Sequence, residues 1–158
     1  MSYASDYPVA EPQRRAIVST LYDDSYNLPL RVLGYSLDRA QVKARRIVLY
    51  IPGYVLPRIL CEVEAAGWEL RAVDRIAPPK DGTADQFRDQ YTKLHIFNMT
   101  DLDALIYLDA DTIATRNIDE LWQLPTRFAA VGYFLLFCFL FDMPPINAWE
   151  SAQRGPNH

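Results

Sequence analysis

Short apolar runs alternate with segments of helical periodicity along most of this chain. Each run has the length of one buried strand, whereas the segments between them carry apolar residues at spacings of three and four. The predicted strands are 16–21, 47–51, 68–73, 104–108 and 127–131. The predicted helices lie near 29–37, at 55–66 and at 87–97, with a short helical turn at 117–121. This alternation predicts a mostly parallel sheet covered on both faces, in an open, doubly wound α/β fold.

Turn-forming and charged residues mark several element ends. Asp23 and Asp24 suit the first turn of a helix, and Pro29 stands near the start of its regular part. Gly67 follows the second predicted helix and is typical of a C-terminal stop. Residues 77–84 are rich in Pro and Gly and are predicted to form a loop. These signals agree with the alternation of strands and helices.

Composition narrows the class of protein. Of the 158 residues, 50% are hydrophobic and 23% are charged, which excludes a mainly disordered, collagen-like or coiled-coil chain and predicts one main domain. The net charge of -4 does not indicate a surface for nucleic acid. The apolar segment 128–141 has fourteen residues, whereas a membrane-spanning helix needs about 20. We therefore expect neither a nucleic-acid partner nor a transmembrane segment.

The cysteines and the N-terminal residues bear on the compartment. Cys61 and Cys138 are too few for a disulfide framework, which favours a reducing compartment. Residues 1–14 are polar, contain two prolines and are predicted to be a flexible tail without a secretory signal. From these features we expect a cytoplasmic protein.

Two carboxylates directly follow the apolar strand at 104–108. In extended backbone, residues two apart point to the same side, so Asp109 and Asp111 are expected to converge at the carboxyl end of this strand. Their mutual repulsion, on the order of a few kcal/mol, would be removed by a hard divalent cation such as Mg²⁺ or Mn²⁺. The alternative is that both residues only end the strand and cap the helical turn at 117–121. No glycine-rich dinucleotide or P-loop motif is present to suggest another ligand.

Several motifs, taken together and in order, resemble one known family. The motifs are Asp24–Tyr26 after the first strand, Val32–Leu37, Tyr91–His95, Leu105–Thr112 and Asn117–Leu121. In this order they resemble glycosyltransferase family 8, the group of glycogenin and galactinol synthase. The resemblance implies a GT-A fold, the nucleotide-diphospho-sugar transferase fold, which would be incomplete here.

The resemblance also implies a donor, a cofactor and a set of site residues. The donor would be a UDP-sugar, either UDP-glucose or UDP-galactose, transferred with retention to an acceptor that the sequence does not identify. Mn²⁺ or Mg²⁺ would be held by Asp109 and Asp111. The residues matched to the uracil, ribose and sugar-diphosphate positions are Thr20, Tyr22, Asp23, Tyr26, Lys93 and Ala110. Glycogenin-like sequences often have asparagine at the position of Asp23. The resemblance assigns no catalytic residue. Without the family, Lys93 would be interpreted as a solvated helix residue.

The resemblance covers about residues 14–131 and stops at Val131. We therefore assign 15–131 to the nucleotide-sugar-binding domain and 132–158 to a hydrophobic, irregular tail. The tail could be a strand or helix covering the sheet, an exposed segment that drives association, or sequence foreign to the family. We favour the last interpretation. Because the histidine ligand and the acceptor-side residues of the family are missing, transfer is expected to be weak or absent in this form.

Two other functions stay open at this point. The chain could be a non-catalytic partner of a full-length homologue, associating through its open sheet edge, and self-association into a homo-oligomer is also left open. A phosphatase of the haloacid-dehalogenase type places a similar motif after a strand, with Asp109 as nucleophile. That family prefers Thr or Val where this chain has Ile113, and it places the motif near the N-terminus.

Overall fold

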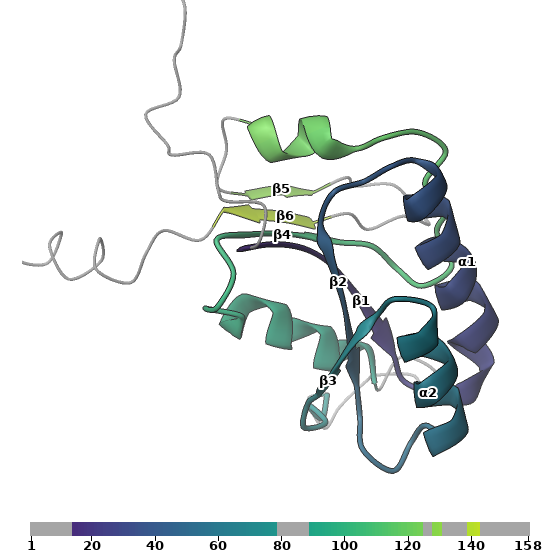
Figure 1. The fold of residues 1–158 in the computed structure, drawn as a ribbon. Coiled ribbons are helices and arrows are strands. Elements are labelled where there is room, and N and C mark those ends of the chain that lie inside the picture. Colours follow the sequence, from purple (N-terminus) through teal and green to yellow (C-terminus); the bar gives the residue numbers. More distant parts are fainter. Residues whose placement is uncertain (1–13, 79–88, 125–127, 131–138, 143–158) are drawn as a thin grey trace, which may run out of the picture.

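A computed structural model describes residues 14–78, 89–124, 128–130 and 139–142. Its centre is a six-stranded sheet with helices on both faces (Figure 1). The strands are β1 (Arg15–Leu21), β2 (Arg45–Tyr50), β3 (Glu69–Ala72), β4 (Ala104–Tyr107), β5 (Phe128–Ala130) and β6 (Phe139–Asp142). The helices are α1 (Asn27–Arg39) and α2 (Pro57–Ala65), with 3₁₀ helices η2 (Asp24–Tyr26), η4 (Gln90–Asn98) and η5 (Asp119–Gln123).

The strand order places a topological switch between β1 and β4. The order across the sheet is β3-β2-β1-β4-β6-β5. The first four of these strands run parallel, whereas β6 is antiparallel to both β4 and β5. The chain therefore builds outward from β1 to β3 and then crosses to the other side of β1. In open α/β sheets, ligands bind at the carboxyl ends of the strands where the order reverses.

Two apolar cores stabilise the sheet, one on each face. Strand residues such as Ile17, Val48 and Ile106 point to the face covered by α1 and α2. The opposite face of the same strands packs against η4, whose buried residue there is Ile96 (Figure 1). Because both faces are covered, the central strands are apolar at successive positions and do not alternate. The predicted mostly parallel, doubly covered sheet is therefore confirmed.

The segment predicted as a helix at 87–97 differs from expectation in two ways. It is a 3₁₀ helix from Gln90 to Asn98, and residues 79–88 lie outside the described part. With three residues per turn, Leu94 and Phe97 share one ridge, and they are 46% and 53% exposed. The buried positions are Thr92 and Ile96. The expected apolar face was therefore wrong, because the ridge of Leu94 and Phe97 is turned toward solvent and Ile96 packs against the sheet instead.

The C-terminal strands extend the sheet past the expected domain boundary. β5 confirms the strand predicted at 127–131. β6, at 139–142, lies in the segment assigned to a tail, yet its backbone pairs with β4 from Ala104 opposite Asp142 to Tyr107 opposite Phe139. Part of that segment is thus a strand of the sheet. The remainder, 131–138 and 143–158, lies outside the described residues.

Candidate functional site

Polar side chains gather where β1 and β4 end, at the topological switch. The two strands are in register with Val18 opposite Tyr107, and Leu108 continues the pairing by donating its N–H to the Val18 carbonyl at 3.0 Å. Their carboxyl ends therefore meet at one edge. Thr20 of β1 and Asp109, which follows β4, are brought to this edge although they are far apart in sequence.

A directed chain of hydrogen bonds links Thr20, Tyr107 and Asp109. The Tyr107 hydroxyl donates to Asp109 Oδ1 at 3.0 Å and lies 3.0 Å from Thr20 Oγ1. A phenol has one proton, so once Tyr107 donates it to the carboxylate, the Thr20 hydroxyl must be the donor to Tyr107. Thr20 is buried and Tyr107 is completely buried. These hydrogen bonds thus run from the core outward to a half-buried carboxylate.

Lys93 brings a positive charge to the same carboxylate from η4. Its ammonium lies 3.6 Å from Asp109 Oδ1 and 5.3 Å from the centre of the Tyr107 ring. The two charged side chains are 20% and 27% exposed, so water screens them less than a surface pair. The structure therefore places Lys93 where a negatively charged ligand at the β1–β4 edge would meet it.

Tyr22 extends the cluster on the β1 side. Burial of its hydroxyl raises the pKa of Tyr22, and the negative charge of Asp109 raises it further. Burial likewise raises the pKa of Tyr107, again with a contribution from Asp109. Both phenols therefore stay protonated, and that of Tyr107 donates a hydrogen bond to Asp109. Among the described residues the Tyr22 hydroxyl, although buried, has no hydrogen-bond partner of good geometry.

The backbone around Asp109 and Asp111 is a turn, whereas the prediction assumed extended backbone. β4 ends at Tyr107, and the Thr112 N–H and hydroxyl both donate to the Asp109 carbonyl, at 3.1 and 2.8 Å. Asp109 is half-buried, Ala110 is buried and Asp111 is exposed. The reason for expecting convergence was therefore wrong, because alternation of side chains applies only within the strand. The turn leaves Asp109 and Asp111 two residues apart, just after the carboxyl end of β4.

Two further predicted residues lie just after β1, on the outer side of this edge. Asp23 is exposed, and its carboxylate caps η2 by accepting the Ser25 N–H at 2.7 Å and the Ser25 hydroxyl. Tyr26 is 43% exposed. Neither makes a hydrogen bond or ion pair with Asp109 in the described structure. The fold thus brings Thr20, Tyr22, Lys93 and Asp109 together and leaves Asp23 and Tyr26 at the rim.

The carboxylates fit a metal only in partnership with a ligand. No group of three or more His, Cys, Asp or Glu side chains capable of holding a metal is present among the described residues. Asp109 and Asp111 offer hard oxygen donors, and Mg²⁺ is commonly held by one or two carboxylates together with phosphate oxygens and water. This donor set fits Mg²⁺ or Mn²⁺ shared with a diphosphate. His95 is turned elsewhere, since its Nε2 lies 2.8 Å from the Asp74 carbonyl oxygen.

Sequence reasoning missed Tyr107 as a member of this cluster. The available signal was its phenol in an otherwise apolar strand, two positions before Asp109. The role of its hydroxyl follows only from the structure, which places β1 beside β4. The partner that identifies it, Thr20, is 87 positions away along the chain.

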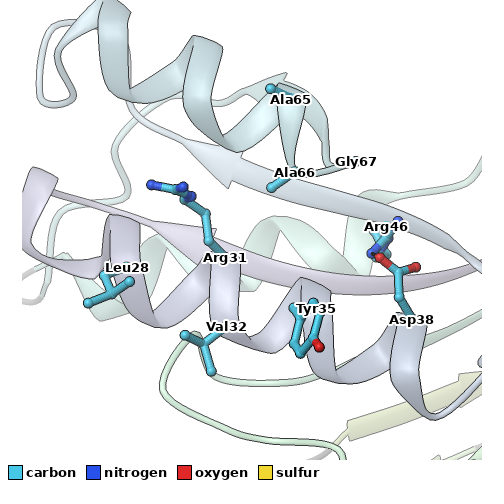
Figure 2. A pocket seen from close by; sticks show the side chains of 9 residues that line it. All are labelled: Leu28, Arg31, Val32, Tyr35, Asp38, Arg46, Ala65, Ala66 and Gly67. Atoms are coloured by element: carbon cyan, nitrogen blue, oxygen red, sulfur yellow. Dashed lines mark ion pairs between the residues drawn. The ribbon is translucent and has the colours of Figure 1, made fainter.

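A separate groove of about 540 Å³ lies on the outer surface of α1 and α2 (Figure 2). Its lining residues are Leu28, Arg31, Val32, Tyr35, Asp38, Arg46, Ala65, Ala66 and Gly67. One ion pair crosses it, between Arg46 and Asp38 at 3.0 Å (Figure 2). None of the predicted site residues lines this groove.

Comparisons with known proteins bear on the segment that carries these residues. The model of glycosyl transferase family 8 matches residues 80–143, which include Lys93, Asp109 and Asp111. Inositol phosphorylceramide glucuronosyltransferase 1 of Arabidopsis thaliana is 36% identical over 72% of this chain and 21% of that protein. UDP-glucuronate:xylan alpha-glucuronosyltransferase 2 of the same plant is 32% identical over 77% of this chain and 20% of that protein. The chain thus spans about a fifth of the length of these relatives.

The fold comparison agrees. An active-site mutant of LgtC has a TM-score of 0.64 at 17% identity, over 90% of this chain and 66% of that one. Among the described residues, no helix has the length and apolar character to cross a membrane. The family match runs to residue 143, past the expected limit at 131, and includes β6. Residues 80–143 thus match glycosyltransferase family 8, and the chain has the GT-A fold.

Proposed function

We propose that this chain binds a UDP-sugar at the β1–β4 edge and belongs to an enzyme that transfers the sugar, with retention, to an acceptor. One observation carries the proposal. Within the family-matched segment, Asp109 is held at the topological switch by Tyr107 and faced by Lys93. This is where an open α/β sheet binds its ligand.

The side chains suit a diphosphate leaving group. As the bond between sugar and phosphate breaks, negative charge grows on the diphosphate oxygens, and Lys93 supplies a positive charge beside them. Asp109 and Asp111 would hold Mn²⁺ or Mg²⁺, which would supply Lewis-acid stabilisation of the same charge. Thr20, Tyr22, Asp23, Tyr26 and Ala110 would contact the uracil and ribose. This chemistry needs no nucleophilic serine or cysteine.

The identity of the donor sugar is a separate part of the proposal. The family resemblance suggests UDP-glucose or UDP-galactose, whereas one relative is named for UDP-glucuronate. We propose that all three donors share the UDP and metal contacts and differ at the sugar. A cytoplasmic location and self-association into a homo-oligomer are further parts of the proposal. We further propose that transfer by this chain is weak, because two carboxylates hold a metal less firmly than a full set of protein ligands.

Calorimetry with UDP, with and without Mn²⁺, tests the proposal. We expect Mn²⁺-dependent binding of UDP that D109N and D111N each weaken by about tenfold or more, since both remove a charged oxygen ligand. D101N is the matched control, because Asp101 pairs with Arg71 and takes no part in the site. Absence of Mn²⁺-dependent binding in the unmodified chain, or equal binding by D109N, would contradict the proposal.

Release of UDP from each donor then measures turnover. We expect slow hydrolysis of at least one of UDP-glucose, UDP-galactose and UDP-glucuronate, dependent on Asp109. Rapid turnover would contradict the expectation of weak activity while leaving the binding proposal intact. Comparison of the three rates identifies the preferred sugar.

A further inference from the structure

Tyr107 occupies an unusual position for a side chain with a polar tip. It is the last residue of β4, is 0% exposed, and lies in a strand flanked by β1 and β6. Its ring packs in the apolar core on the η4 face. The hydroxyl nevertheless reaches the sheet edge, where it meets Thr20 and Asp109. Because the ring is enclosed, the hydroxyl is held in one place.

The two oxygens of Asp109 have different surroundings. Oδ1 accepts the Tyr107 hydroxyl at 3.0 Å and faces the Lys93 ammonium at 3.6 Å. Among the described residues, no hydrogen bond reaches Oδ2. One oxygen is thus tied to the protein, while the other is available to a ligand. Since the hydrogen bond from a buried phenol is fixed in direction, it sets the rotation of the whole carboxylate.

We propose that Tyr107 is a positioning residue that orients Asp109 for metal binding. This inference rests on the proposed function and adds a residue to it. The Thr20 hydroxyl, by donating to Tyr107, keeps the phenol proton directed at Oδ1. Without the Tyr107 hydroxyl, Lys93 is the remaining partner of Oδ1, and the carboxylate can turn into a closer ion pair that competes with the metal. Partners of this kind behind a metal ligand commonly affect metal affinity about 10- to 100-fold.

Y107F tests the inference, because it removes the hydroxyl and keeps the ring. The measurement is the Mn²⁺ concentration that half-saturates UDP binding, together with the Kd of UDP in EDTA and the melting temperature. We expect Y107F to raise the half-saturating Mn²⁺ concentration about tenfold. The Kd of UDP in EDTA should stay unchanged, and excess Mn²⁺ should restore UDP affinity. Y50F is the matched control, since Tyr50 ends β2, one strand away from β1.

The outcomes separate this inference from the proposed function. A half-saturating Mn²⁺ concentration within twofold of that of the unmodified chain overturns the positioning role. Equal weakening with and without Mn²⁺ also overturns it, since that is the signature of a structural role. Absence of Mn²⁺-dependent UDP binding in the unmodified chain overturns the proposed function itself.

A second pair of variants keeps the test decisive if Y107F does not fold. T20S retains the donor to Tyr107, whereas T20V removes it at almost constant volume. We expect T20V to need more Mn²⁺ for half-saturation than T20S. Equal Mn²⁺ requirements in the two variants overturn the inference.

Discussion

At the residue scale, a glycine in α1 allows a fully buried tryptophan to pack. Trp68 is 1% exposed, and its ring lies against Gly34 in the middle of α1. A Cβ placed on Gly34 would come within 2.7 Å of Trp68 Nε1. The Gly34 carbonyl also accepts a hydrogen bond from Arg46 at 2.9 Å. Glycine is therefore required here by the close approach of the indole.

This contact predicts that G34A destabilises the protein. Alanine favours a helix over glycine by about 1 kcal/mol. The clash with an enclosed ring costs about 1–3 kcal/mol, and we expect it to prevail. Urea unfolding should show a lower midpoint for G34A than for the unmodified chain. An equal or higher midpoint would show that Trp68 can move aside at little cost.

At the element scale, two ion pairs attach β3 to its neighbours in the sheet. Arg45 of β2 binds Glu69 of β3 through two hydrogen bonds, at 2.9 and 2.6 Å. Arg71 of β3 binds Asp101, just before β4, at 3.0 and 2.8 Å. β3 is a short strand at the edge of the sheet, and its burial is partial. These paired side chains supplement the limited apolar packing.

The ion pairs predict a dependence of stability on pH. Hydrogen bonds from Arg45 lower the pKa of Glu69 from 4.5, and those from Arg71 lower the pKa of Asp101 from 3.8. A lowered carboxyl pKa stabilises the fold above the unfolded-state value, and this contribution is lost as the pH falls through the folded-state value. Because the carboxylates are about half exposed, each pair contributes at most about 1 kcal/mol.

Urea titrations of E69Q and D101N measure this effect. At neutral pH both variants should be less stable than the unmodified chain. The difference should shrink below pH 4.5 for E69Q and below pH 3.8 for D101N. E64Q is the control, because Glu64 forms no ion pair among the described residues. A difference that stays constant down to low pH would argue against these pairs as its source.

At the scale of the whole molecule, β6 protects the strand that carries the site. β4 lies between β1 and β6, and its residues Ile106 and Tyr107 are completely buried. Without β6, the backbone donors and acceptors on one side of β4 would lose their partners. β5, which pairs with β6 in the described sheet, would lose its place as well. The expected domain boundary at 131 would thus separate β6 from the rest of the sheet.

This arrangement predicts different behaviour for two shortened chains. A chain ending at residue 143 retains β6 and should unfold cooperatively in urea. A chain ending at 131 exposes the β4 edge, so we expect a lower urea midpoint or aggregation. Size-exclusion chromatography and urea unfolding measure the difference. Identical midpoints and elution would show that β6 contributes little to the fold.

The sequence by itself determined the fold class and five of the six described strands, and it indicated the residues of the candidate site. Buried parallel strands leave continuous apolar runs, so the segments at 16–21, 47–51 and 104–108 could be recognised locally. The motifs around Lys93 and Asp109 were recognisable because they are contiguous in sequence. The family match confirms the family and the tertiary structure confirms the fold.

Only the tertiary structure decided which of these residues meet. The contact of Thr20 with Tyr107 depends on β4 lying beside β1, and strand order leaves no local pattern in sequence. The turn at Asp109 and the pairing of β6 likewise depend on hydrogen bonds between backbone groups, which are the same for every residue type except proline. Hydrophobic periodicity reports which side chains are buried. It does not report the neighbours against which they are buried.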